Sequence, residues 1–481
     1  MRTQASILFY YNDTRVEVSD HRLLMPLAEF LRREVLLSGT KIVCSEGDCG
    51  ACTVLVGYPE PNGKINYQSV NSCILPVFLL NGAHVITVEG VGTRENPHPV
   101  QKSMVEHFGS QCGYCTPGFI TAMAGLAEQA IEEKKSIDAK KACHALTGNL
   151  CRCTGYEGII QAATNLKLSP EHSLRKKYLN PSRDQELSQA RQKSVNIELD
   201  TISIHLPVNL TEALELKKKH PDIRLVSGAT DLSVLVNKGK QAYQKVLSLQ
   251  QVQELHQIQK NKETVVVGSQ VTIDQIENEL VDVYPEFVRL LHIFASPQIK
   301  HRATLVGNVV NASPIADTIP FLMVTEAVIC VEGLSGKRKI PICDFYLGYK
   351  KLNLNPDEIV TGIEIPKLQE DQKLRLYKAS QRKDLDISSV TFAGILETQD
   401  KKISNLRLAF GGVGPTVIRL NQVEKKYIGQ ALTKETVQRL GEEVSGSINP
   451  LSDLRASKEY RYLLVKNFIH KFFDEISGGL A

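Results

Sequence analysis

The residues of this sequence that could bind a metal are gathered near its N-terminus. Nine of the eleven cysteines lie at or before Cys153, and only Cys330 and Cys343 follow. A disulfide framework would need an oxidising compartment and preferably an even number of cysteines, and the sequence shows neither an export signal nor an even count. The distribution therefore indicates metal or cluster ligation.

The first set of cysteines follows the plant-type ferredoxin spacing. The pattern is Cys44-x4-Cys49-x2-Cys52 with Cys73 further along, and it predicts a loop around a 2Fe-2S cluster. Glycines within CSEGDCGAC would let the backbone turn tightly and point N–H groups at the cluster sulfurs. Four cysteines could also hold zinc, but zinc sites favour two short CxxC pairs, so we predict a cluster.

The second set consists of two short pairs at the ends of expected helices. Cys112-x2-Cys115 and Cys151-x-Cys153 have a spacing that fits zinc and a second iron–sulfur cluster equally well. The other three cysteines, Cys143, Cys330 and Cys343, match neither pattern, and we interpret them as small core residues.

Hydrophobic periodicity supplies the elements that would position these residues. The first 90 residues alternate in strand fashion around a helix at 27–33, and helices are expected from Pro99, from Pro117, and over 139–146 and 159–166. The polar, proline-containing segment after them has the composition of an exposed connector, and an α+β region follows it. We expect a ferredoxin-like domain (1–92), a helical domain (93–168), a linker (169–196), an FAD-binding domain (197–370) and a flavoprotein C-terminal domain (371–481).

Composition excludes several classes of partner. The formal net charge is +4 without a dense basic block, which gives no case for nucleic acid. The most apolar stretch, near 319–331, is interrupted by polar residues and is too short for a membrane span. We expect a cytoplasmic protein that contacts neither nucleic acid nor membrane.

Four strings carry a resemblance to a known family. CSEGDCGACTVLVG, NSC, QCGYCTPG and GNLCRCTGY together resemble the iron–sulfur region of the xanthine dehydrogenase family of molybdenum hydroxylases. The resemblance implies a plant-type β-grasp ferredoxin domain and a four-helix bundle that also carries a 2Fe-2S cluster, hence two clusters in total. It also implies that Gln111 lies beside the molybdopterin of a partner domain.

The second half continues the resemblance and implies FAD. VSGATDL is similar to the family's flavin pyrophosphate loop, although Ala229 stands where a second glycine is usual, and HRATLVGNVVNASPIADTIP is similar to its second FAD segment, with Val306 in place of a glycine. GIEIP, AFGGVGPTVIR and PLSDLRAS extend the match through a two-part α+β FAD-binding domain and an α+β C-terminal domain. The residues implied to contact FAD are Ser227, Gly228, Ala229, Thr230, Asp231, Gly307, Asn308, Ser313, Asp317, Val360 and Lys378.

The resemblance also implies a role. Nothing in the sequence resembles the family's molybdopterin domain, so hydroxylation is expected on a separate large subunit, and no catalytic acid or base is expected on this chain. This chain would be the small subunit of a bacterial xanthine dehydrogenase, in a heterotetramer of two small and two large subunits. Electrons would pass from molybdenum to the cluster of the helical domain, then to the plant-type cluster, to FAD and to NAD+.

Two other functions stay open at the level of sequence. The chain could serve an aldehyde or other heteroaromatic hydroxylase that uses oxygen or another acceptor. It could also be a reductase or electron carrier that works without a molybdenum partner. Reduction of the flavin by NADH would argue against the first, and a tightly bound molybdopterin subunit would argue against the second.

Overall fold

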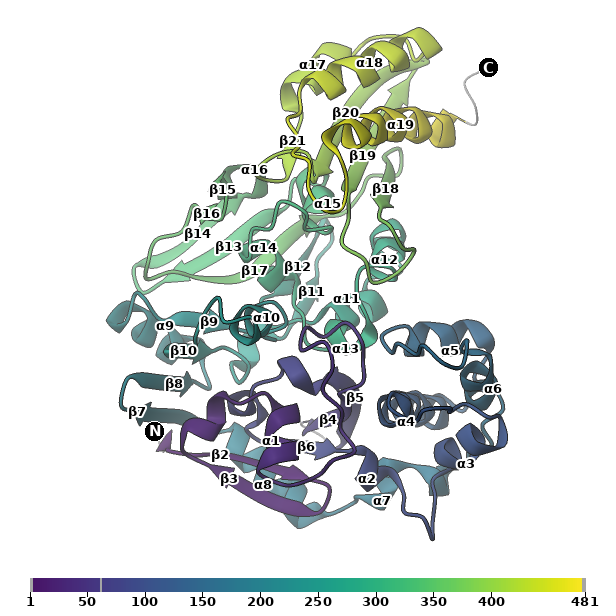
Figure 1. Ribbon diagram of the computed structural model, residues 1–481. Coiled ribbons are helices and arrows are strands. Elements are labelled where there is room, and N and C mark those ends of the chain that lie inside the picture. Colours follow the sequence, from purple (N-terminus) through teal and green to yellow (C-terminus); the bar gives the residue numbers. More distant parts are fainter. Residues whose placement is uncertain (1–2, 61–62, 478–481) are drawn as a thin grey trace. The chain divides into compact units, whose positions relative to one another are not determined.

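The computed structural model describes residues 3–60 and 63–477 and divides into two compact units. The first unit comprises residues 1–216, 222–253 and 296–303, and the second comprises residues 217–221, 254–295 and 304–481. Each unit combines sheets with covering helices (Figure 1). The multidomain α+β fold expected from the sequence is confirmed.

The N-terminal sheet of the first unit holds the first cysteine loop. Its five strands run in the order β3-β2-β6-β4-β5. Their bounds are Thr14–Val18, Ile7–Tyr11, Ala83–Ile86, Thr53–Pro59 and Ile65–Asn71. Helix α1 (Leu27–Arg33), at the predicted position, buries Leu27, Phe30 and Leu31 against this sheet's core. The cysteine loop precedes β4, and Cys73 follows β5.

Helices form the next part of the first unit, as periodicity predicted. They are α2 (Val88–Val91), α3 (Pro99–Glu106), α4 (Thr116–Glu133), α5 (Ala139–Leu146) and α6 (Glu157–Thr164). Pro99 and Pro117 lie in the first turns of α3 and α4, where a missing N–H costs nothing. The long helix α4 is buried along most of its length and packs against α3, α5 and strand β4.

The segment expected to be an exposed connector is folded and packed. Residues 170–191 form the 3-10 helix Pro170–His172, α7 (Leu174–Lys177) and α8 (Pro181–Arg191). Leu174, Tyr178 and Leu187 are buried in the core of the helical part. The expectation of exposure is therefore wrong for these side chains, because a few apolar residues at helical spacing outweigh a polar composition. The domain boundaries themselves stay a prediction.

A second sheet of the first unit follows this segment. Its order is β1-β7-β8-β10-β9. The strands span Thr3–Gln4, Ser194–Leu199, Ile202–Leu206, Lys245–Ser248 and Arg224–Val226. Helices α9 (Leu210–Lys219) and α10 (Leu232–Asn237) lie on either side of β9 in the chain. The short helix α13 (Pro297–Lys300) also belongs to this unit, although it comes from much later in the sequence.

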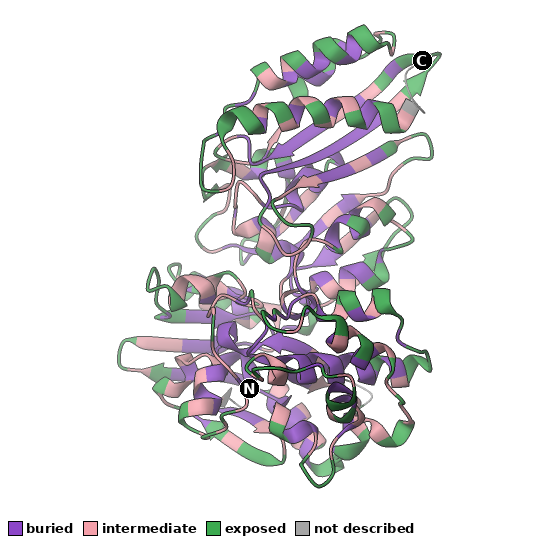
Figure 2. Cartoon of the chain, turned by 45° about the vertical axis from the view of Figure 1, so that its right-hand side comes forward, coloured by how far each residue is buried: buried purple, intermediate pink, exposed green. Residues whose placement is uncertain are grey.

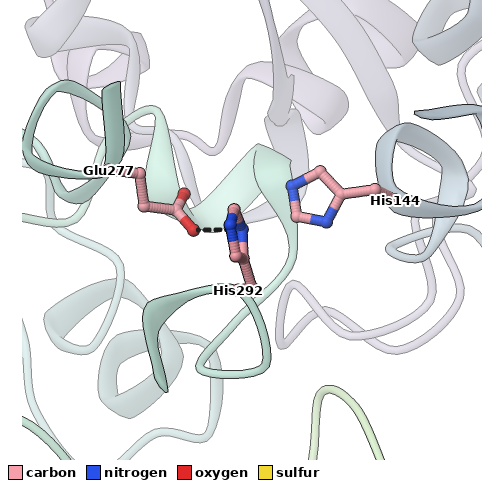
Figure 3. Close-up of side chains that lie close together, drawn as sticks. All are labelled: His144, Glu277 and His292. Carbon is pink, nitrogen blue, oxygen red and sulfur yellow. Dashed lines mark ion pairs between the residues drawn. The ribbon is translucent and has the colours of Figure 1, made fainter. Parts of the chain in front are cut away.

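Two antiparallel sheets dominate the second unit. One has the order β11-β12-β17-β13-β14. Its strands are Ile258–Lys260, Thr264–Gly268, Ile359–Pro366, Val328–Gly333 and Gly336–Pro341. Helices α11 (Ile273–Glu279) and α12 (Pro285–Leu291) follow β12, and His292 Nδ1, just after α12, lies 3.1 Å from a carboxylate oxygen of Glu277 on α11 (Figure 3). The helices α14 (Leu305–Val310), α15 (Ile319–Val324) and α16 (Ile342–Phe345) and a small ribbon of β15 (Tyr346–Gly348) and β16 (Lys351–Leu352) complete this part.

The C-terminal sheet has the order β18-β19-β20-β21. Its strands are Lys373–Ala379, Val390–Gln399, Lys402–Gly411 and Ile418–Arg419. Helices α17 (Asn421–Tyr427), α18 (Lys434–Gly446) and α19 (Lys458–Ser477) cover it, so that the strands are buried along most of their length while the helices expose their outer faces (Figure 2). Phe392, Phe410, Phe472 and Phe473 form the centre of this core. Among the described residues, no helix has the length and apolar character required to cross a bilayer.

A buried histidine lies within the N-terminal sheet of the first unit. His84 on β6 receives a hydrogen bond from the Tyr67 hydroxyl at Nδ1 (2.5 Å), and its Nε2 donates to the Asn12 carbonyl (2.6 Å). Burial, followed by the charge of nearby Arg183, lowers the pKa of His84 to about 3. The imidazole is therefore neutral in the folded unit at ordinary pH.

This histidine predicts acid destabilisation of the first unit. The folded pKa lies below the unfolded value of 6.5, so the stabilisation is fully present above pH 6.5 and is lost as the pH falls toward 3. Between pH 6.5 and 5 the free energy of unfolding should fall by about 2 kcal/mol from this group. Urea unfolding at both pH values should show this decrease in the free energy of unfolding for the wild type and a smaller decrease for His84→Gln. The control His21→Gln, at an exposed position, should show the same decrease as the wild type. An equal decrease in all three proteins would contradict the prediction.

Candidate functional site

The structure brings together the first group of thiols, those of Cys44, Cys49, Cys52 and Cys73. Hydrogen bonding with the thiols of Cys49 and Cys73 lowers the pKa of Cys44 far below its ordinary value, and Cys52 interacts with Cys73 in the same way. The structure therefore gathers all four residues of the predicted plant-type site. Four cysteine side chains gathered at this spacing are a donor set that fits a 2Fe-2S cluster.

Glycines shape this loop for a steric reason. Gly47 and Gly50 have φ of 81° and 67°, a region that residues with a side chain rarely adopt. A Cβ on Gly50 would lie 2.3 Å from the carbonyl oxygen of Gly148, so the loop also approaches the second cysteine segment more closely than any other residue would allow. The glycines predicted to turn the loop thus bring two cysteine segments into contact.

The second group of thiols is also assembled by the fold. The Cys112 thiol pairs with that of Cys153, and the Cys115 thiol pairs with that of Cys151. Burial raises the pKa of Cys115 to about 12. Burial also acts on Cys151, but hydrogen bonds from Thr154 and from backbone N–H groups outweigh it and lower its pKa to about 7.

The two groups differ in exposure. Cys52 and Cys73 are buried, whereas Cys112 and Cys153 are exposed. Phe108 (85% exposed), Gln111 and Tyr114 (51% exposed), which lie close to Cys112 in the sequence, are exposed as well. Cys44, Cys49 and Cys115 are intermediate and Cys151 is buried, so the second group reaches the surface through Cys112 and Cys153, in a segment with exposed apolar side chains, and the first group is the more buried of the two.

Two of the remaining cysteines are not core residues. Cys143 on α5 and Cys343 on α16 are exposed, so the interpretation of both as small core side chains is wrong. Each occupies a position on a short helix whose buried face is supplied by other residues, Ala142 and Leu146 in α5 and Ile342 and Phe345 in α16. Cys330 is half-buried in β13.

A direct backbone contact joins the two cysteine loops. The N–H of Leu150, next to Cys151, donates a hydrogen bond of 2.9 Å to the carbonyl oxygen of Cys49. The neighbouring Asn149 donates from Nδ2 to the Gly50 carbonyl oxygen, also at 2.9 Å. Sequence reasoning did not single out Asn149, because its partner lies 99 positions away in the chain.

The loop expected to bind the flavin pyrophosphate lies between β9 and α10. A Cβ on Gly228 would lie 1.8 Å from the carbonyl oxygen of Arg302, so only glycine fits there. Ala229 has φ of +60°, a left-handed conformation that glycine adopts more easily, and this explains why glycine is usual at this position. The loop ends at Thr230 and Asp231, directly before α10.

Helix α10 connects this loop to the first group of thiols. Asn237, at its C-terminal end, donates from Nδ2 to the carbonyl oxygens of Ser45 (2.8 Å) and Cys73 (2.9 Å). Lys238 forms an ion pair with Glu46 at 2.9 Å. Val234 of the same helix packs against the buried cluster around Cys52. The order along these contacts is exposed thiols, buried thiols, then the helix that follows the 227–231 loop.

The other residues expected at FAD belong to the second unit. Asp317, which is 5% exposed, receives hydrogen bonds from the hydroxyls of Ser388 and Thr391 and pairs with the Lys378 ammonium at 2.7 Å. Lys378, whose side chain is 1% exposed, is thus no surface lysine. Ser388 and Thr391 were missed by sequence reasoning, since serine and threonine carry no signal of their own.

The remaining candidates of this unit lie on regular elements. Asn308 on α14 receives a hydrogen bond from Thr318 at 2.6 Å, and Gly307 precedes it on the same helix. Ser313 lies in the turn after α14, and Val360 is buried in β17. Val306 is also buried on α14, where the helical backbone places no demand for glycine.

Three segments of the chain match models of known protein families. Residues 198–368 match the model of the FAD binding domain in molybdopterin dehydrogenase, residues 375–476 match the CO dehydrogenase flavoprotein C-terminal domain, and residues 87–164 match a [2Fe-2S] binding domain. Xanthine dehydrogenase 1 of Arabidopsis thaliana is 30% identical over 98% of this chain and 40% of its own length. The corresponding enzyme of Drosophila subobscura is 29% identical over 99% of this chain and 39% of its own.

The chain belongs to the xanthine dehydrogenase family of molybdenum hydroxylases. It spans about two fifths of the length of the curated relatives that it matches. Solved structures support the fold of part of it. Carbon monoxide dehydrogenase of Hydrogenophaga pseudoflava covers 57% of this chain with 96% of its own (TM-score 0.54, 23% identity), and quinoline 2-oxidoreductase of Pseudomonas putida 86 covers 59% with 100% of its own (TM-score 0.54, 21% identity).

The left-handed backbone at Ala229 predicts a stabilising substitution. Ala229→Gly should raise the free energy of unfolding by about 1 kcal/mol, because an alanine in this conformation costs about that much relative to glycine. Thermal unfolding measures the difference. Ala213→Gly, in the middle of α9, should instead be destabilising; a loss of stability in Ala229→Gly would contradict the assignment of strain.

The buried pair of Lys378 and Asp317 predicts a strong coupling in stability. Lys378→Met leaves the Asp317 carboxylate buried without its cation and should cost about 3 kcal/mol. Adding Asp317→Asn should recover part of this loss. The exposed pair Lys339–Glu364 provides the control, since Lys339→Met should cost less than about 1 kcal/mol. Additive effects of the two substitutions at 378 and 317 in denaturant unfolding would refute the coupling.

Proposed function

We propose that this chain is the iron–sulfur and FAD subunit of an NAD+-dependent xanthine dehydrogenase. A separate molybdopterin subunit would oxidise hypoxanthine and xanthine to urate, in an assembly of two small and two large subunits. A cytoplasmic location accords with the eleven free cysteines. The observation that carries the proposal is the assembly of eight thiols into two groups, of which the first contains two buried thiols and the second two exposed ones, joined by the hydrogen bond from Leu150 to Cys49.

Each group of side chains would hold one cofactor. Cys44, Cys49, Cys52 and Cys73 would ligate one 2Fe-2S cluster, and Cys112, Cys115, Cys151 and Cys153 would ligate the other. The loop 227–231 would approach the FAD diphosphate through its backbone N–H groups. The other residues proposed to contact FAD are Gly307, Asn308, Ser313, Asp317, Val360 and Lys378. When bound, the clusters supply one-electron transfer and the flavin joins it to the two-electron reduction of NAD+.

The chain's own residues position these groups and exclude water. Burial of Cys52 and Cys73 keeps one cluster site away from solvent, and exposure of Cys112 and Cys153 leaves the other open toward a partner. Asn237 holds the carbonyl groups of the buried site in place from the helix that follows the proposed pyrophosphate loop. The order of these contacts supports electron entry at the exposed site and exit at the flavin.

The exposed Phe108, four residues before Cys112, supports a partner at the second thiol group. Phe108 has a left-handed backbone and exposes most of its ring, which is costly in water unless another protein covers it. Phe108→Asp should weaken binding of a purified molybdopterin subunit at least about tenfold, as expected of an aromatic anchor. Leu454→Asp, at a fully exposed position of the second unit, should not weaken it. Unchanged affinity for Phe108→Asp in a titration would place the partner elsewhere.

Anaerobic titration with NADH tests the acceptor. A chain with full iron and flavin content should bleach in both flavin and cluster absorption, because electrons enter at FAD and spread over connected sites. Asp317→Asn, with flavin content verified, provides a variant of the proposed FAD contact whose bleaching should slow. An unchanged spectrum in the fully loaded wild type would favour an acceptor other than NAD+.

A further inference from the structure

Three segments that are distant in the sequence meet at one buried point between the two thiol groups. Thr53 follows the first cysteine loop, Asn149 precedes Cys151, and Gln298 lies on α13; their exposed fractions are 2%, 2% and 1%. We call these three side chains, with the carbonyl group of Gly50, the inter-loop junction. All four residues belong to the first unit.

The hydrogen bonds of the junction run in one direction. Gln298 donates from Nε2 to Asn149 Oδ1 (2.8 Å) and to Thr53 Oγ1 (3.3 Å). Asn149 donates from Nδ2 to the Gly50 carbonyl oxygen (2.9 Å) and to Thr53 Oγ1 (3.3 Å). Thr53 in turn donates to the Gly50 carbonyl oxygen (2.6 Å). The chain of donors therefore ends at the carbonyl oxygen of Gly50, the residue after Cys49.

Gln298 determines which way the Asn149 amide faces. A side-chain amide has one donor end and one acceptor end, and the donor from Gln298 requires Oδ1 of Asn149 on its side. The amide nitrogen of Asn149 is then directed at Gly50, beside the backbone bond from Leu150 to Cys49. If Asn149 turned over, its oxygen would face the Gly50 carbonyl oxygen, and the two loops would repel each other at this point.

Close packing leaves no room for another arrangement. A Cβ on Gly148 would lie 2.1 Å from Oε1 of Gln298, and a Cβ on Gly118 would lie 2.3 Å from the Gly50 carbonyl oxygen. The junction is thus enclosed by backbone on the sides of both cysteine segments. A side chain from α13, far along the sequence, completes it.

We propose that Gln298 is a positioning residue for electron transfer between the two cluster sites. By fixing the Asn149 amide, it holds the loop of Cys49 and Cys52 against the loop of Cys151 and Cys153, so that one electron can pass without movement of atoms or protons. This inference rests on the proposed function, because it requires a cluster in each thiol group. It gives a residue outside both cysteine motifs control over the contact between them.

Electron paramagnetic resonance of the fully reduced chain tests the proposal. Two reduced clusters held in a fixed geometry split each other's signals, and dithionite reduces both without requiring NADH or a partner. In Gln298→Glu, a carboxylate replaces the donor and favours the turned-over Asn149. We expect both cluster signals to remain at full iron content, while the mutual splitting is lost and the potential of the buried cluster falls.

A matched control separates this effect from the general cost of a buried charge. Gln251 belongs to the same unit and is 2% exposed. It accepts a hydrogen bond from Asn81 and donates to the carbonyl oxygens of Lys193 and Leu206. Gln251→Glu should keep the wild-type splitting and potentials. Wild-type splitting and potentials in Gln298→Glu would overturn the proposal, and so would an equal loss of splitting in Gln251→Glu.

Two further variants keep the test decisive. If Gln298→Glu does not retain iron, Gln298→Met removes the donor without adding charge and should weaken the splitting in the same direction; an unchanged splitting overturns the proposal. Because Gln298 acts through Asn149, the double variant Asn149→Leu with Gln298→Met should match Asn149→Leu alone. Failure of the proposed function is separate: the wild-type chain would then lack iron for two clusters or show one signal.

Discussion

The hydrogen bond from the Leu150 N–H to the Cys49 carbonyl oxygen is the contact on which the arrangement of the thiols depends. It joins the loop before β4 to the loop between α5 and α6. The acceptor is Cys49 itself, and the donor, Leu150, is the residue before Cys151. Gly50, Gly118 and Gly148 are required around it because any Cβ there would collide with backbone or with Gln298. The distance between these two loops cannot increase without separating the two groups of thiols.

Sequence reasoning reached the parts of the molecule that are encoded locally. Cysteine spacing identified both thiol groups, and periodicity placed α1 and α5 at their observed bounds, because each of these signals spans only a few residues. Contacts between distant segments were not accessible in this way. Gln298 and Asn149 are 149 positions apart in the sequence, and the residues around each give no signal that the two are in contact. The packed helix α8 was missed for a related reason, since its three buried side chains are diluted by polar neighbours.

The two departures from the family's usual glycines have different physical meanings. Ala229 occupies a left-handed backbone conformation, so its methyl group costs conformational energy. Val306 lies on a helix, where a side chain is accommodated without strain, and its bulk is buried in the second unit's interior. A departure in the sequence thus weakens a loop in one case and adds to a core in the other, and only the backbone angle distinguishes the two.

The position of α13 has a consequence for biosynthesis. The first cysteine loop and its sheet are complete once residue 86 has been made, yet Gln298 and Ile299, which pack against this loop, follow much later. At about 5 to 20 residues per second, the ribosome needs roughly 10 to 40 s to reach them. During that interval the apolar cluster around Cys52 and Cys73 lacks its contact with Ile299, and Asn149 lacks its hydrogen bond from Gln298. The contact of α13 with the first cysteine loop can therefore form only after most of the first unit has been synthesised.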